Sequence, residues 1–234
     1  MASACATSHK KVRSALVSEP ATLHYLLETP RVEKSPYKKI FLSVTPALVE
    51  EDTTILEKTR FYVIPLLIYN QSMRTDHYAI SANGIKENLT DFLREGFLRQ
   101  AERDCEYVFT SSKDSADYLL NLGIENFNGE TNINSYGHNF IFPFFPLLTI
   151  TWRNALNYNI NSSVKLNYQV TDIQGETIVD DAVMHHDSLA NISLLNINIP
   201  KVKDYTAANA SVTEGLSICF QNCFEQIIKE LNEI

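Results

Sequence analysis

The sequence predicts an α+β domain in which a mainly antiparallel sheet carries two main helices on one face. Residues 162–172 alternate apolar and polar side chains, as a half-buried strand does. Residues 83–103 and 204–232 instead carry an apolar stripe of helical period. Two strands, a helix, a run of strands and a second helix follow one another along the chain. That order favours helices that share one face of the sheet.

Two strands are predicted before the first helix. Residues 37–44 and 60–70 are apolar enough for strands, and the second run is nearly continuous, which indicates burial on both faces. Pro65 has no backbone N–H, so that point of the second strand is expected at a sheet edge or a bulge. The helix that follows is expected to begin at a cap formed by Ser81 or Asn83. Its apolar face consists of Ile85, Leu89, Phe92, Leu93 and Phe97.

The second half of the chain is predicted to be a meander of strands that ends in a helix. Short strands are expected at 106–110 and 117–127. A hairpin of 162–172 and 177–184 follows, with its turn at Gln174-Gly175. The stripe of the final helix consists of Leu216, Phe220, Cys223, Phe224, Ile227, Ile228 and Leu231.

Length and charge narrow the class of protein. The 234 residues suit one domain, assigned to residues 20–234, after a flexible N-terminal tether, residues 1–19. The formal net charge of −8 argues against a nucleic-acid partner, because a phosphate-binding surface needs clustered lysine and arginine. No run of side chains approaches the ~18 apolar residues that span a bilayer.

Cys5 is the predicted point of attachment to a membrane. Ser3-Ala4-Cys5 resembles the end of a bacterial lipobox, in which a small residue precedes the cysteine that receives the lipid. The following residues are polar and lack hydrophobic periodicity, as a tether does. The alternative is an ordinary cysteine in a disordered terminus. We expect a lipid anchor on the periplasmic side of the outer membrane, which Ala6 in place of aspartate favours.

Cys219 and Cys223 stand four residues apart on the final predicted helix and therefore share one face. No histidine lies near them in sequence. We interpret them as small buried side chains rather than as metal ligands.

Residues 136–152 form the predicted binding segment. They combine six phenylalanine, tyrosine and tryptophan side chains with two prolines that interrupt regular structure. An exposed segment of this composition calls for a partner or a membrane surface. The alternative is that it folds back over the sheet as core. The partner-binding residues expected here are Phe140, Phe142, Phe144, Phe145, Leu147 and Trp152.

Motifs for catalysis are mostly missing, and no enzyme activity, cofactor or metal is predicted. The glycines form no phosphate-binding cluster, and no zinc-protease helix or nucleophile elbow is present. Asp180-Asp181 with His185-His186-Asp187 is the best remaining candidate for a metal-dependent hydrolase. Neighbours in a strand point to opposite faces, however, so both histidines cannot reach one ion.

The order of elements resembles a group of periplasmic lipoproteins. A helix to Arg103, the strand Tyr107-Val108-Phe109 and then Ala116-Asp117-Tyr118 resemble the ABC-transport auxiliary lipoproteins, the LptE-like proteins and the N-terminal domain of TolB. The Asp-x-x-Gly hairpin within 164–179 is similar to one that follows in those families. The resemblance covers residues 60–184 and implies an accessory or assembly protein without catalytic residues.

Three functions remain open from the sequence. The first is a lipid-anchored envelope protein that binds a protein complex through residues 136–152 or a sheet edge. The second is a carrier whose aromatic side chains enclose a lipid or another apolar ligand. The third is the metal-dependent hydrolase. The oligomeric state is left open.

Overall fold

One sheet and two long helices make up the described part of the chain. The computed structural model describes residues 22–25, 38–46, 57–58, 69–80, 85, 88–141, 149–196 and 202–234. Strands and helices follow in the order β1 Lys39–Val44, β2 Glu57–Lys58, β3 Tyr69–Ile80, α2 Leu89–Asp104, β4 Val108–Thr110, the 3-10 turn η2 Lys113–Ser115, β5 Tyr118–Ile141, β6 Thr149–Asp172, β7 Thr177–Asn196 and α3 Val202–Leu231.

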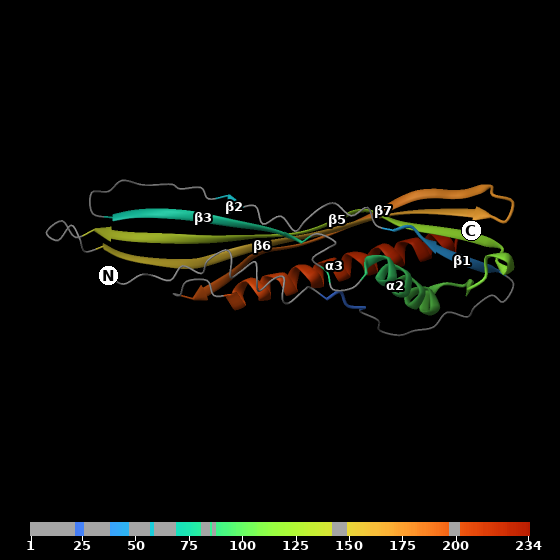
Figure 1. The fold of residues 1–234 in the computed structure, drawn as a ribbon, viewed down its shortest axis with the longest axis horizontal. Coiled ribbons are helices and arrows are strands. Elements are labelled where there is room, and N and C mark those ends of the chain that lie inside the picture. The colour runs from blue at the N-terminus through green and yellow to red at the C-terminus, as the bar shows by residue number, and fades with distance from the viewer. Residues whose placement is uncertain are drawn as a thin grey trace.

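The sheet is mixed, so the prediction of a mainly antiparallel sheet was not correct. β1 pairs in parallel with both β4 and β5. The pairs β2–β3, β3–β5, β5–β6 and β6–β7 are antiparallel. Parallel neighbours need a crossover connection, and α2 lies in the chain between β1 and its two parallel partners. The predicted α+β class with both helices on one face is confirmed (Figure 1).

The core lies between the helices and one face of the sheet. In β6 the even-numbered residues from Ile160 to Val170 are buried, whereas Lys165 and Asn167 on the other face are more exposed. α3 covers β6 and β7 with the apolar stripe that the sequence predicted, and Leu216, Cys223 and Ile227 are fully buried. α2 packs beside α3 and over β1 (Figure 1).

α2 begins later than predicted. Its N-cap is Asn88, whose side-chain Oδ1 accepts from the backbone N–H of Thr90 at 2.9 Å. Ile85 is buried but lies in a β-bridge rather than in the helix. The apolar residues that predicted a helix start near Asn83 therefore belong to two structures. Ile85 lies in a β-bridge, and the others lie in α2. Helix ends are decided by such caps.

β5 and β6 are much longer than predicted, and together with β3 they project beyond the helices. β5 and β6 each contain 24 residues, or about 80 Å of extended chain. α3 contains 30 residues, or about 45 Å of helix. The paired strands β3, β5 and β6 therefore extend past the N-terminal end of α3 (Figure 1). We call this extension the arm and define it as residues 69–73, 136–141 and 149–154.

Several predicted features lie outside the described residues. They include the tether 1–19 with Cys5, most of the predicted strand 60–70 with Pro65, and both prolines of the predicted binding segment. The β6–β7 hairpin with its turn at Gln174-Gly175 is confirmed, although β7 extends to Asn196. Neither described helix combines the length and the apolar composition that crossing a bilayer requires.

Candidate functional site

The arm is the part of the predicted binding segment that the structure describes. Phe140 lies near the end of β5 and Trp152 near the start of β6. Phe142, Phe144, Phe145 and Leu147 lie between these strands, outside the described residues. The segment around them is thus the end of one long hairpin, and both prolines fall in its connection. β5 continues up to Ile141 and β6 from Thr149 onward, so the strands on either side of the prolines are not interrupted.

Strand pairing brings the aromatic residues of the arm into alternate rows. Phe140 pairs with Tyr69 on one side and Ile150 on the other, and Trp152 pairs with His138. The alternate rows are Tyr69–Phe140–Ile150, Gln71–His138–Trp152 and Met73–Tyr136–Asn154. The rows between and beside them are Ile141–Thr149, Asn70–Asn139–Thr151 and Ser72–Gly137–Arg153.

Backbone pairing continues from the helix-covered part of the sheet into the arm. Phe127 of β5 packs against Phe220 of α3, with ring centroids 6.1 Å apart, so it faces the helix layer. Thr131, four residues further along β5, is buried. From there the pairing of β5 with β6 continues to Ile141, and the bulge between Asn134 and Ser135 adds its extra residue to β6 rather than to β5.

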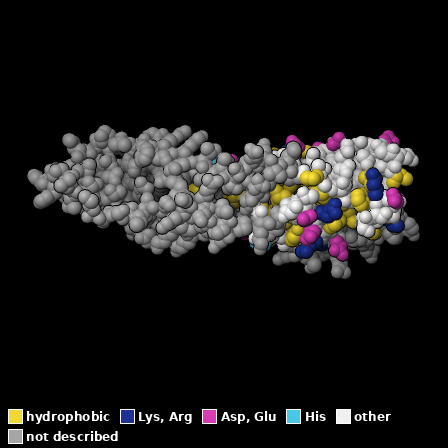
Figure 2. All heavy atoms as spheres, in the orientation of Figure 1, with side chains coloured by type: hydrophobic (Ala, Val, Ile, Leu, Met, Phe, Trp, Pro, Cys, Tyr) yellow, Lys and Arg dark blue, Asp and Glu magenta, His cyan; other side chains and the backbone are white. Residues whose placement is uncertain are grey.

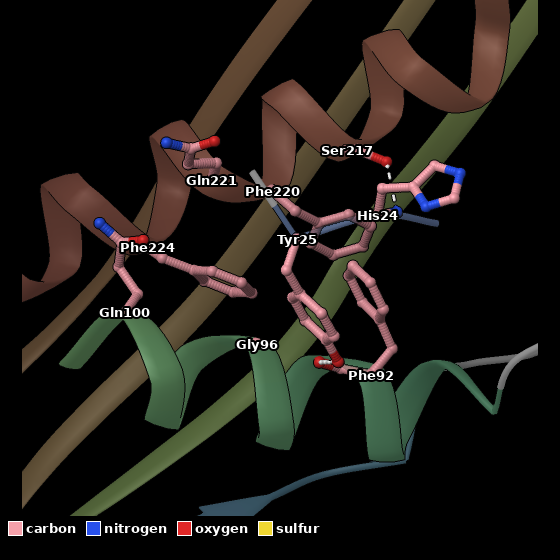
Figure 3. Close-up of a pocket in the computed structure, with 9 residues that line it drawn as sticks. All are labelled: His24, Tyr25, Phe92, Gly96, Gln100, Ser217, Phe220, Gln221 and Phe224. Atoms are coloured by element: carbon pink, nitrogen blue, oxygen red, sulfur yellow. Dashed lines mark hydrogen bonds between the residues drawn. The ribbon is translucent and has the colours of Figure 1, made fainter. Parts of the chain in front are cut away.

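A shallow pocket between α2 and α3 is filled by a short N-terminal segment, residues 22–25. The Tyr25 ring stacks on Phe92 at a centroid distance of 4.7 Å and an angle of 8°. Its hydroxyl donates to the backbone carbonyl of Phe92 at 3.1 Å. The backbone N–H of His24 donates to Ser217 Oγ at 3.1 Å, which ties the segment to α3 (Figure 3). Residues 22–25 thus join the two helices.

Gly96 makes room for the Tyr25 ring. A Cβ at this position would lie 2.4 Å from Tyr25 Cε1, closer than any side chain allows. The guanidinium of Arg99 lies over the same ring at 4.8 Å from its centroid, an arrangement that stabilises by a cation–π interaction. The space left beside these groups is about 10 Å³, which is about one water molecule. This pocket is too small for the lipid that a carrier would hold.

The acidic and histidine residues of β7 are divided between the two faces of the sheet. His185 pairs with the buried Val164, and its Nε2 lies 3.3 Å from Gln226 Oε1 on α3. His186 pairs with Ser163 on the opposite face. Among the described residues, no group of three or more histidine, cysteine, aspartate or glutamate side chains has the arrangement of a metal site. The division of the two histidines agrees with the alternation expected from the sequence.

Cys219 and Cys223 are buried, as the sequence predicted, and they pack against β6 and β7. Cys223 Sγ lies 3.7 Å from the carbonyl oxygen of Val164. Burial raises the pKa of the Cys219 thiol to about 11, and the nearby Asp187 charge adds to this. Burial likewise raises the pKa of Cys223 to about 12. Thiols held in the protonated form are poor nucleophiles and metal ligands.

Tyr168 connects the sheet to the end of α3. Its ring is buried and its hydroxyl donates to Glu230. Burial, followed by this hydrogen bond, raises the pKa of Tyr168 well above its usual range. The hydrogen bond to Glu230 explains why the phenol is held neutral.

Charges on the described surface are of both signs. Figure 2 shows lysine, arginine, aspartate and glutamate side chains among apolar ones on the described part of the face in view. Arg103 bridges Asp104 at 2.6 Å and Glu225 at 3.6 Å, and Lys165 bridges Glu125 at 2.6 Å.

Several solved structures match the chain, whereas no family model and no curated protein matches its sequence. One is a minor lipoprotein from Acinetobacter baumannii, with a TM-score of 0.38 and 12% identity over 87% of this chain and 94% of the other. The second is a protein from Xanthomonas campestris described as a member of the DUF330 family. Its TM-score is 0.33, with 12% identity over 87% of this chain and 89% of the other.

Proposed function

We propose that the chain is a non-enzymatic accessory or assembly protein of the bacterial cell envelope. In this proposal a lipid on Cys5 holds it at the periplasmic side of the outer membrane. The arm, with the segment between β5 and β6, binds a protein partner through Phe140, Trp152 and the intervening Phe142, Phe144, Phe145 and Leu147. Support comes from the lipobox-like Ser3-Ala4-Cys5, the polar residues after it and the resemblance to envelope lipoproteins in the order of elements.

The observation that carries the binding role is the register of the arm. The alternate rows that contain Tyr69, Phe140 and Trp152 hold most of its aromatic and apolar residues beside Gln71, His138 and Asn154, whereas the other rows are polar or glycine except for Ile141. Within a single hydrophobic core the apolar face of a sheet packs against its helices. In this proposal, strand alternation continued from Phe127, which faces α3, puts Phe140 and Trp152 on the face away from the helices. Large aromatic residues grouped in this way are typical of the centres of protein interfaces.

Capture of the partner is expected to depend on this face of the arm. The double variant Phe140→Ser/Trp152→Ser should reduce capture at least about tenfold, because central aromatic side chains commonly contribute more than about 1.4 kcal/mol each. The tagged full chain would be used as bait on detergent-solubilised envelopes, with captured proteins quantified by mass spectrometry.

The matched control changes two residues in the row between those of Phe140 and Trp152. Asn139→Ser/Thr151→Ser should leave capture unchanged, since these residues pair with each other on the polar face. Equal capture by all three proteins would refute the role of the aromatic face. Binding of the same proteins to lipid vesicles is measured in parallel. If Phe140→Ser/Trp152→Ser no longer bound vesicles but still captured every protein, the arm would contact lipid instead.

Lipid attachment is expected at Cys5 alone. Metabolic labelling with a palmitate analogue in a bacterial host should mark the chain, and Cys5→Ser should abolish the label. Cys105→Ser is the control, because Cys105 is completely buried and inaccessible to an acylating enzyme. Label retained in Cys5→Ser would exclude the proposed anchor without affecting the role of the arm.

A further inference from the structure

β7 forms an edge of the sheet. Among the described strands it pairs only with β6, and it lies at the margin of the ribbon in Figure 1. Its pairing with β6 is regular over residues 179–189, with register shifts only outside that stretch. The large hydrophobic side chains that are exposed in the described chain all belong to this hairpin: Ile173, Ile178, Met184 and Leu189. A regular edge strand is a template for pairing with another strand.

One hydrogen bond identifies which backbone groups face outward from this edge. The N–H of Ala182 donates to the side-chain Oδ1 of its neighbour Asp181 at 2.7 Å, so it is not directed into the ladder with β6. N–H groups alternate in direction along a strand. The outward groups in this regular stretch therefore belong to Asp180, Ala182, Met184 and His186.

We propose that β7 pairs antiparallel with β7 of a second copy of this chain, about a two-fold axis at Val183. The hydrogen-bonded pairs are then Asp180 with His186 of the second copy and Ala182 with its Met184. Each pair joins two residues whose N–H groups face outward, as an antiparallel ladder requires. Asp181 comes opposite His185 of the second copy at a non-hydrogen-bonded position.

The pairing of hydrogen-bond donors with acceptors selects this register. With the axis at Val183, both aspartates, which accept, face histidines of the other copy, each of which has a ring N–H to donate, and the symmetry repeats each pair. Moving the axis to Met184 sets Asp181 opposite Asp187, a like-charge pair that destabilises. Moving it to Ala182 sets Asp180 and Asp181 opposite Met184 and Val183, which removes both complementary pairs.

The side chains at the seam are available for these contacts. Asp180, Asp181 and His186 are exposed, and His185 is half-buried beside Gln226. Asp181 exchanges its bond to the N–H of Ala182 for an imidazole N–H donor, and the Ala182 N–H then donates across the seam. Met184 is 56% exposed in the single chain, and it gains Ala182 of the second copy as a cross-strand neighbour. This surface is separate from the arm, so the pairing does not depend on the proposed function.

Sedimentation of the full chain over a concentration series tests the pairing. We expect a dimer whose dissociation constant rises at least tenfold in Asp180→Lys/Asp181→Lys. Glu102→Lys/Asp114→Lys is the control, because it makes the same change in net charge at two exposed positions elsewhere and should leave the dimer unchanged. A single chain at all concentrations, or a dimer equally affected by both variants, would overturn the proposal.

Cysteine cross-linking tests the register in a Cys5→Ser background. Cα atoms of a non-hydrogen-bonded antiparallel pair are ~4.5 Å apart, within the range that a disulfide bridges. Asp181→Cys/His185→Cys should therefore form a disulfide-linked dimer under mild oxidation. Asp181→Cys alone should not, because position 181 faces position 185 rather than itself. Cross-linking by the single variant as efficient as by the double variant would refute this register.

Discussion

Replacing Phe220 by alanine is expected to lower the free energy of unfolding by about 4 kcal/mol. Phe220 is 1% exposed. Its ring meets Phe92 of α2 edge-on at a centroid distance of 5.3 Å, and Phe224 of α3 at 6.0 Å. It also packs against Phe127 of β5. One side chain thus joins both helices to the sheet, and its removal leaves a cavity between three elements that cannot all move inward.

A loss of this size is a large fraction of the ~5–15 kcal/mol that stabilises a typical domain. Urea unfolding followed by circular dichroism measures it. Phe220→Leu keeps most of the volume and should cost about 1 kcal/mol. Gln221→Ala, on the next residue of α3, should change stability by less than about 0.5 kcal/mol. If alanine and leucine at position 220 had equal effects, Phe220 would not occupy the central position that the ring contacts indicate.

The same variant connects the core to the N-terminal segment. Phe220 lines the pocket in which Tyr25 lies (Figure 3). Loss of its ring removes one wall of that pocket, so amide exchange at residues 23–25 should increase more than exchange in β6. The stacking of Tyr25 on Phe92 and the bond from His24 to Ser217 are the contacts that weaken.

The periodicity of apolar residues predicted those helices and strands that bury only one of their faces. The stripe of α3 could be predicted because residues three and four apart on a helix share a face. The alternation of 162–172 could be predicted because only one face of β6 meets the helices. Parallel pairing of β1 with β5 was not predictable in this way, since it depends on contacts between Ile40 and Tyr118, which are far apart in the chain.

The arm was missed for a different reason. Asparagine is disfavoured in strands, and asparagine-rich stretches such as 126–139 resemble loops. Both partners of the β5–β6 hairpin nevertheless continue to Ile141 and from Thr149, because each strand completes the hydrogen bonds of the other. Which aromatic residues share a face could not be predicted either. The bulge at Leu156 determines which residues of β6 share a face with which residues of β5. A shift of the register by one residue would reverse the face of every residue beyond it.

Gly215→Ala is expected to destabilise the protein by about 2 kcal/mol, the opposite of its effect in an open helix. Alanine is favoured over glycine inside helices by about 1 kcal/mol. At this position, however, a Cβ would lie 2.6 Å from Ser162 Oγ and 2.9 Å from Asp187 Oδ2. Ser162 is fully buried, and its hydroxyl donates to the carbonyl of Val212 at 3.0 Å. The methyl group must therefore push α3 away from β6 or break that hydrogen bond.

A double-mutant cycle with Ser162→Gly separates this close approach from other effects of the alanine. Ser162→Gly removes both the Oγ and the Cβ that the new methyl group would meet, the latter at 3.1 Å. The close neighbour that remains is Asp187 Oδ2 at 2.9 Å, the end of a side chain that can turn aside. In that background Gly215→Ala should therefore become close to neutral, which gives a coupling free energy of at least about 1 kcal/mol. Urea unfolding of the four proteins provides the measurement. Stabilisation by Gly215→Ala in the native background would mean that α3 does not rest directly on β6. The same close approach holds α3 beside Asp187 and so determines how near the helix lies to the β7 edge.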